Sequence, residues 1–508
     1  MIMRNTRKRF AAGLGALAVT LGSFGLGAAA SADQVGQVGP DQEGHPTSGS
    51  LTIHKLVGSQ GSAGDGTQQN ISGKALADVD FTIWRLGKDS GDTCKAIDLT
   101  DTNAWANVPA TTAPATLDDV KAAGYCVVDP AAGTTKTTDA NGELTFSGLA
   151  LGVYYVDETK APANVSSKSA PFYVSVPLPH TDGSWIYNVH AYPKNQVVDA
   201  PSKTINTDVN QGGLTVGSTV QYTITQTVPA LNAGETYKSA SIWDVMPTDG
   251  SLAYNSTASV KLNGTALDAA DYTIDPSGTT WKLSDSGLKK LHAGDTIEVV
   301  FTAKVLKVTA TGDIQNPGSD GTKPGYGSEF NGGKVPGGPT PYTYWGQLKV
   351  TKVDKKDKAL AGAKFAVTAK GTEACAAEVG NQTVVSAGTS GSDGVVLWSP
   401  NTPDKSSPLG LFVANSSNGA LTNPSKDYCL YETKAPAGYT GAAVKSVNVE
   451  AGTTAMLNVS VTNTQKEGPK LPLTGAQGTL LMVVGGLVLV AAGTGAVVAT
   501  RKRQAAQD

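Results

Sequence analysis

Alternation of apolar and polar residues is the dominant pattern of this chain. It is clearest in four segments, namely 171–179 (PFYVSVPLP), 220–225 (VQYTIT), 298–305 (EVVFTAKV) and 457–462 (LNVSVT). Because successive side chains of a strand point to opposite faces, such segments between Gly, Pro, Asn and Asp turns predict antiparallel strands of β-sandwiches. Between the chain ends, only Thr116–Ala123, which contains LDDVKAA, favours a short helix. The pattern predicts an all-β protein.

An apolar run near the N-terminus differs from the strand pattern. It extends from Phe10 to Leu26, follows four basic residues and precedes AAASAD. Basic residues, a short apolar segment and an Ala-x-Ala site are the parts of a secretory signal peptide, which we assign to residues 1–32. The alternative is an N-terminal membrane anchor, but the run is Gly-rich and shorter than the ~20 residues that a span needs. The chain is therefore predicted to be exported.

A second apolar run, residues 478–500, carries no charge and is followed by Arg501, Lys502 and Arg503. It is long enough to cross a bilayer, and its basic end is expected to stay in the cytoplasm. The residues shortly before it read LPLTG, which are Leu471, Pro472, Leu473, Thr474 and Gly475. The order of LPxTG motif, apolar span and basic tail resembles the sorting signal of Gram-positive surface proteins. The resemblance implies a membrane-bound precursor that becomes anchored to the cell wall.

Composition divides the rest of the exported chain into three domains of ~130–150 residues. The predicted parts are an N-terminal segment (33–47), a first domain (48–195), a second domain (196–344), a third domain (345–466) and the sorting region (467–508). A Gly/Pro-rich stretch, residues 318–342, is interpreted as a long loop near the end of the second domain. Residues 371–427 are interpreted as a surface-loop insertion in the third domain.

Charge and cysteine content narrow the class of protein. The net charge is −3 in 508 residues and no basic stripe is present, which excludes a nucleic-acid-binding surface. Four cysteines in an exported chain permit disulfides, and four cysteines allow three connectivities. The domain boundaries favour the pairs Cys94–Cys126 and Cys375–Cys429.

Each outer domain has a lysine at a core-facing position of its first strand. Residues two apart in a strand share a face, so Lys55 lies on the face of Leu51 and Ile53. In the same way, Lys352 shares its face with Val350. Because lysine is rarely buried unless it is paired, both positions call for a partner. The alternative is a different register, in which each lysine lies at a solvated strand end.

The same alternation predicts partners for both lysines. The last strands of the outer domains end in inward-facing asparagines, Asn195 and Asn463. The six-residue segment ETKAPA occurs twice, and its strand parity turns Glu158 and Glu432 inward. The sequence therefore predicts two core triads of lysine, glutamate and asparagine.

Such a triad can react with itself. Burial lowers the pKa of lysine and raises the pKa of glutamate, so that both groups can be neutral. A neutral amine can attack the asparagine side-chain carbonyl, which is polarised by the protonated glutamate, and expel ammonia. The product is an amide cross-link, and the fold supplies the effective molarity, so no enzyme is needed.

Several segments resemble one protein family. Residues 428–439 (YCLYETKAPAGY) resemble the E-box of Gram-positive pilins, and residues 348–367 resemble the start of a collagen-adhesin B-type, transthyretin-like domain. With the signal peptide and sorting signal in pilin order, the chain resembles major shaft pilins of Gram-positive sortase-assembled pili, the SpaA and FimA type of fimbrial subunit. The resemblance implies three tandem immunoglobulin-like β-sandwich domains with internal Lys–Asn bonds.

The second domain resembles the adhesin A-type domain, in which an aspartate replaces the glutamate of the triad. The resemblance implies a triad of Lys203, Asp244 and Asn316. Isoleucines two residues away from each of them fit inward-facing strands. Asn331 is a rival to Asn316.

Residues 185–195 (WIYNVHAYPKN) resemble the pilin motif WxxxVxVYPKN and depart from it at Ala191. Lys194 lies on the opposite face from Asn195, where a partner can reach it; the alternative is an ordinary solvated lysine. The resemblance implies that a sortase joins Thr474 of one subunit to Lys194 of the next, which gives a head-to-tail polymer. The implied partners are identical subunits, pilus-specific and housekeeping sortases, minor pilins, peptidoglycan and a host glycan or protein receptor.

Three functional classes compete. The first is the major subunit of a covalent pilus that supports adhesion, and the second is a monomeric wall-anchored adhesin or minor pilin, which does not need Lys194. The third is a wall-anchored enzyme, but the sequence has no HExxH, no GxSxG and no paired metal-ligand spacing. We therefore expect no enzymatic activity, no cofactor and no metal.

Overall fold

The computed structural model describes residues 38–91, 93–128, 130–207, 212–316, 325–338, 340–399 and 403–469, with a few positions between 483 and 490. The predicted signal peptide, the LPLTG motif and most of the run 478–500 lie outside the described residues. Within the described residues, no helix has the length and apolar character needed to cross a membrane. The chain divides into two compact units, the first ending at Gln196 and the second beginning at Val197.

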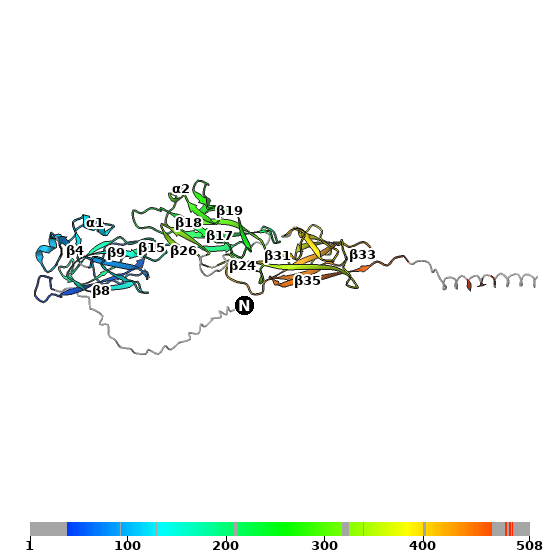
Figure 1. The fold of residues 1–508 in the computed structure, drawn as a ribbon, viewed down its shortest axis with the longest axis horizontal. Coiled ribbons are helices and arrows are strands. Elements are labelled where there is room, and N and C mark those ends of the chain that lie inside the picture. The colour runs from blue at the N-terminus through cyan, green and yellow to red at the C-terminus, as the bar shows by residue number, and fades with distance from the viewer. Residues whose placement is uncertain are drawn as a thin grey trace, which may run out of the picture. The chain divides into compact units, whose positions relative to one another are not determined.

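The first unit is built almost entirely of strands, shown in blue and cyan in Figure 1. One three-stranded sheet consists of β14 (Asn188–Ala191), β1 (Ser48–His54) and β8 (Glu143–Ala150). A four-stranded sheet consists of β10 (Val165–Ser167), β15 (Lys194–Val197), β2 (Leu56–Val57) and β3 (Lys74–Ala75). The largest sheet consists of β11 (Phe172–Val176), β9 (Gly152–Lys160), β4 (Asp80–Asp89), β5 (Cys94–Ala96), β6 (Cys126–Val127) and β7 (Thr134–Thr137). A small hairpin and two helices complete the unit, namely β12 (Leu178–Pro179), β13 (Trp185–Ile186), η1 (Thr102–Asn107) and α1 (Leu117–Ala122).

In the described part of the second unit there are four five-stranded sheets and the short helix α2 (Asp285–Leu288). The first sheet consists of β16 (Ser202–Ile205), β17 (Thr219–Thr227), β23 (Thr296–Val305), β19 (Leu252–Leu262) and β20 (Thr265–Ala266). The second consists of β21 (Tyr272–Ile274), β22 (Thr280–Leu283), β18 (Ala240–Asp244), β25 (Tyr326–Phe330) and β26 (Gly333–Pro336). The third consists of β24 (Asp313–Gln315), β27 (Tyr342–Asp354), β35 (Gly452–Gln465), β33 (Tyr439–Thr440) and β31 (Leu409–Ser416). The fourth consists of β30 (Val396–Ser399), β29 (Val384–Ser390), β28 (Lys364–Ala369), β32 (Ser425–Lys434) and β34 (Lys445–Glu450).

Alternating burial along these strands forms the cores, as the sequence pattern predicts. In β17 and β23, every second side chain from Val220 and Ile297 onward is buried. Tyr222 and Phe301 lie in this core with their ring centroids 5.5 Å apart. Because inward apolar and outward polar residues alternate, each sheet has one face that must be covered by another layer. The prediction of an all-β protein of immunoglobulin-like sandwiches is confirmed.

Two local predictions are also confirmed. Helix α1 begins directly after Thr116, whose hydroxyl caps it by accepting a hydrogen bond from the backbone N–H of Asp119. The disulfides pair Cys94 with Cys126 and Cys375 with Cys429, as the domain boundaries favour.

The Gly/Pro-rich stretch 318–342 is not a long loop throughout, which corrects the sequence interpretation. Residues 326–336 form the hairpin of β25 and β26, and Val335 pairs with Ser328. Its turn is Asn331–Gly332, with both residues at positive φ. An Asn-Gly pair favours this two-residue turn because both residues tolerate the left-handed conformation.

The interpretation of residues 371–427 as a loop insertion is likewise wrong in part, because strands form at 384–390, 396–399 and 409–416. Strands β29, β30 and β31 lie within it and pair with β28, β29 and β27 respectively. Their apolar residues form part of the core, among them Trp398 and Leu411, both fully buried. The predicted division between the second and third domains, at 344/345, falls inside the continuous strand β27. That division stays a prediction.

Candidate cross-link sites and polymerisation lysine

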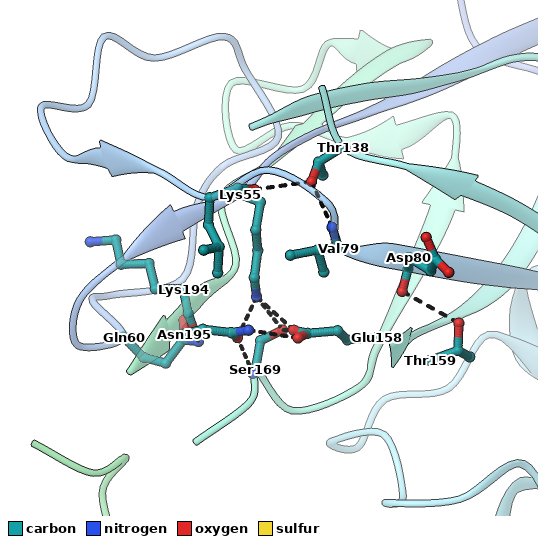
Figure 2. Close-up of polar contacts among 11 residues, drawn as sticks. Lys55, Gln60, Val79, Asp80, Thr138, Glu158, Thr159, Ser169, Lys194 and Asn195 are labelled. Carbon is teal, nitrogen blue, oxygen red and sulfur yellow. Dashed lines mark hydrogen bonds and ion pairs between the residues drawn. The ribbon is translucent and has the colours of Figure 1, made fainter. Parts of the chain in front are cut away.

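The predicted residues of the first domain meet in its core, as Figure 2 shows. The Nζ of Lys55 lies 2.7 Å from Oε2 of Glu158 and 2.6 Å from Oδ1 of Asn195. The Nδ2 of Asn195 donates to Oε1 of Glu158 at 2.6 Å. The side chains of Lys55 and Glu158 are fully buried. The amine thus lies in contact with both the carboxylate and the carboxamide.

Parallel pairing of the first and last strands brings Lys55 and Asn195 together. Strand β1 pairs in parallel with β14, and β2 pairs in parallel with β15, so that Asn195 is opposite Val57. Lys55 lies in the break between β1 and β2, where its N–H donates to the carbonyl of Gly142 at 2.7 Å. Pro193, which has no N–H, lies in the matching break between β14 and β15. The positions of Lys55 and Asn195 therefore follow from strand parity and from this shared break.

The surroundings of Lys55 favour its neutral form. Desolvation lowers the pKa of Lys55 to about 8, although the charge of Glu158 acts in the opposite direction. The ring of Phe81 lies 5.3 Å from its Nζ and forms part of the apolar wall. The lowered pKa increases the neutral, nucleophilic fraction of the amine near neutral pH.

The sequence did not point to Ser169, which contacts all three residues of this site. Its Oγ accepts a hydrogen bond from Lys55 Nζ and donates one to Glu158 Oε2, both at 2.8 Å. Its backbone N–H donates to Asn195 Oδ1 at 2.7 Å. Ser169 lies between strands β10 and β11, in a segment without strand alternation. No pattern in the sequence therefore indicates which way its side chain points.

In the second unit, the structure brings Lys203, Asp244 and Asn316 together. Lys203 forms a buried ion pair with Asp244 and donates to the backbone carbonyl of Asn316 at 3.1 Å. Asp244 also accepts a hydrogen bond from the side chain of Asn316. The rival Asn331 lies elsewhere, in the β25–β26 turn, where its Oδ1 accepts from the backbone N–H of Lys238 at 2.6 Å.

Aromatic rings enclose this second site. The Nζ of Lys203 lies 4.8 Å from the ring centroid of Tyr222, 5.5 Å from that of Phe301 and 5.4 Å from that of Tyr326. Desolvation lowers the pKa of Lys203 to about 8 and raises the pKa of Asp244. The two shifts move the pair toward the neutral forms that an amine nucleophile and a carboxylic acid need.

The third site has the predicted residues but a different contact pattern. The Nζ of Lys352 donates to the backbone carbonyl of Val461 at 2.8 Å and lies 3.9 Å from Oε1 of Glu432. Asn463 donates its Nδ2 to Oε1 of Glu432 at 2.8 Å. Its Oδ1 is buried and has no hydrogen-bond partner in the described part of the chain. Desolvation also lowers the pKa of Lys352.

Lys194 lies beside the first site but points away from it (Figure 2). It is half-buried on the wall of a groove of about 750 Å³, which His190, Tyr192 and residues 60–64 also line. Gln60 fixes the strand at this point by donating to the backbone carbonyl of Lys194 at 2.6 Å. Neighbouring residues of β15 thus present one side chain to the core and one to the groove.

Comparisons with known proteins place the chain among Gram-positive pilin subunits. Residues 46–196 match the N-terminal domain D1 of Gram-positive pilin subunits, and residues 463–505 match the LPXTG cell wall anchor motif. The chain is 31% identical to fimbrial subunit type 2 of Actinomyces naeslundii, covering 98% of this chain and 97% of that one. It is 29% identical to fimbrial subunit type 1 of Actinomyces viscosus, with 99% of each chain covered.

A solved structure shows the same architecture. The full-length major pilin SpaD from Corynebacterium diphtheriae is 27% identical and superposes with a TM-score of 0.59, covering 83% of this chain and 98% of that one. The protein is located on the cell-wall-anchored surface pilus, and its role is structural rather than enzymatic. The chain belongs to the fimbrial subunit family of Gram-positive bacteria, the major pilins of sortase-assembled pili.

Proposed function

We propose that this fimbrial subunit is the repeating unit of a covalent pilus shaft, joined head-to-tail from Thr474 of one subunit to Lys194 of the next. The observation that carries the proposal is the position of Lys194. Its amine points away from the buried cross-link site, and the side chain lines an open groove. Asn195, its neighbour, is fully buried and cannot be reached by a partner.

The chemistry of joining is an acyl transfer. A sortase cysteine attacks the Thr474 carbonyl and releases the chain from Gly475 onward, leaving a thioester. The neutral amine of Lys194 from another subunit attacks this thioester, forms an amide and releases the cysteine. A head-to-tail contact of this kind does not close on itself and so extends into a fibre. A housekeeping sortase then transfers the polymer to a peptidoglycan amine. Minor pilins join the shaft, and the finished pilus binds a host glycan or protein receptor.

Internal cross-links would stabilise each subunit against extension. In each sandwich, the lysine amine replaces the amide nitrogen of the asparagine, and one ammonia leaves. The supporting contacts are the buried triads at Lys55, Lys203 and Lys352. An amide across a domain restricts the unfolded chain in the way that a disulfide does, and it cannot be reduced.

A wall extract boiled in SDS tests polymerisation. We expect a ladder of high-mass species that contain this protein, and tryptic peptides in which the Thr474 carbonyl is bound to the Lys194 amine. A wall-anchored protein that runs only as a monomer would overturn the shaft proposal. The remaining reading would then be a monomeric adhesin or minor pilin.

Cross-linking at the second site should have a bell-shaped pH dependence. Below the raised pKa of Asp244, both groups hold their protons and Lys203 is not nucleophilic. Above the lowered pKa of Lys203, about 8, the amine is neutral but Asp244 has no proton to donate. We expect the fastest reaction between these limits, measured as loss of ammonia after refolding of unlinked chain over a pH series. A rate that keeps rising well above pH 8 would contradict this assignment of roles.

A further inference from the structure

Ser169 holds a position that the lysine, glutamate and asparagine roles do not account for. Its hydroxyl bridges Lys55 and Glu158, and its backbone N–H points at the carboxamide oxygen of Asn195 (Figure 2). The residue is buried. A serine that served packing alone would not need three hydrogen bonds to the three groups that react.

We propose that Ser169 is a fourth catalytic residue of the first-domain cross-link, in which its N–H binds the oxyanion and its hydroxyl passes a proton from Lys55 to Glu158. The inference rests on the proposed self-reaction of Lys55 with Asn195. Its chemical basis is that Ser169 provides two groups. Its backbone N–H contacts the carboxamide oxygen of Asn195, and its hydroxyl lies between the Lys55 amine and the Glu158 carboxylate.

The backbone N–H of Ser169 acts on the electrophile. When Lys55 Nζ attacks Cγ of Asn195, negative charge develops on Oδ1, which this N–H already contacts at 2.7 Å. A fixed donor in a buried site stabilises such a charge strongly. At the third site, Asn463 Oδ1 has no such partner among the described residues. The third site thus lacks, among the described residues, the donor that the first site has.

The Ser169 hydroxyl transfers protons between Lys55 and Glu158. Lys55 begins with three protons on Nζ, and it keeps one in the amide. One of the two released protons joins Nδ2 of Asn195, which leaves as ammonia, and the other remains on Glu158, so charge and atoms balance. As Nζ of Lys55 moves toward Cγ of Asn195, it moves away from Oε2 of Glu158. The Ser169 hydroxyl lies 2.8 Å from Nζ and 2.8 Å from Oε2, so it still connects the two atoms for proton transfer.

Refolding of the mature chain tests the role of Ser169. Chain recovered unfolded and unlinked is refolded under disulfide-forming conditions, and the Lys55–Asn195 peptide is quantified over time by mass spectrometry. We expect Ser169→Ala to slow this link about 100-fold, the lower end of the range for a general acid–base group, while Ser169→Thr, which restores the hydroxyl, recovers to within about 10-fold of wild type. Ser166→Ala is the matched control, since Ser166 Oγ is buried nearby without a hydrogen-bond partner in the described structure.

The outcomes separate the two proposals. If wild type never forms the link, the first-domain cross-link is wrong, and the role of Ser169 with it. If Ser169→Ala links as fast as wild type, or no slower than Ser166→Ala, only the role of Ser169 is overturned. Formation of the Cys94–Cys126 disulfide reports folding of each variant. Should Ser169→Ala not fold, the wild-type rate in mixtures of H₂O and D₂O decides. A proton passed through the hydroxyl moves two protons in one step, so the rate should fall along a curve as the deuterium fraction rises. A linear fall, or no fall, would overturn the relay.

Discussion

Lys194→Ala is expected to convert the high-mass ladder of wall extracts into monomer. The reaction needs a neutral amine at the groove, and an alanine at this position has no nucleophile with which to attack the sortase thioester. Folding should be unaffected, because the side chain is half-buried and points away from the core site. The measurement is an immunoblot of boiled wall extract together with the fraction of subunit recovered as monomer. We expect loss of essentially all polymer.

Two further variants make this expectation specific. Lys194→Arg keeps the positive charge but cannot act as an amine nucleophile, so it should also give monomer. Lys160→Ala is the matched control, because Lys160 also lies at a strand end of the first unit and its side chain is 73% exposed. It should leave the ladder intact. A ladder that survives in Lys194→Ala, or disappears in Lys160→Ala, would show that another lysine is the acceptor.

The positions of the core lysines were predictable because strand alternation is strict. Lys55 and Lys352 fall on the same parity as buried apolar neighbours, and both are fully buried in the structure. The alternation also assigned opposite faces to Lys194 and Asn195, as found. Because side chains in a strand alternate between two faces, knowing which face is the core decides for every residue whether its side chain points inward or outward.

The contacts within each site were not predictable, because they depend on rotamers and on loops. Ser169 comes from a connection between strands, where no periodicity fixes the direction of a side chain. Lys352 has the predicted parity, yet its amine donates to the carbonyl of Val461 rather than to Asn463. Parity places a residue on a face but does not choose among the hydrogen-bond acceptors there.

The missed strands have a different cause. The hairpin of β25 and β26 lies in a glycine-rich segment whose composition is typical of loops. Its Asn331–Gly332 turn, a strong hairpin signal, was outweighed by that composition. In 371–427, strands such as β31 are continuously apolar because both of their faces are covered, so they lack the alternation that marks other strands.

Asp244→Ala and Asn316→Ala are expected to destabilise the second sandwich by different amounts, although neither can form its cross-link. The link would join residues 113 apart, and loss of a loop closure of that length costs about 5 kcal/mol. Asn316→Ala should show this loss alone, because Lys203 keeps its ion pair with Asp244. Asp244→Ala also leaves a fully buried lysine without a counter-charge, which costs about 3–5 kcal/mol more.

Hydrogen exchange in β17 and β23 of the mature chain measures both losses, since these strands enclose Lys203 and report opening of this sandwich. Intact mass provides the control, because each variant should retain one more ammonia than wild type. The excess loss in Asp244→Ala should shrink as pH rises toward about 8, the pKa of Lys203 when it is paired with Asp244. Without Asp244, burial lowers the pKa of Lys203 further. In this range the folded Asp244→Ala chain has released a proton that its unfolded chain still binds, so its stability rises with pH, whereas folded Asn316→Ala still holds that proton. Equal protection in the two variants at neutral pH would mean that Lys203 is not held as an unpaired buried charge, and that Asp244 does not have the role assigned to it.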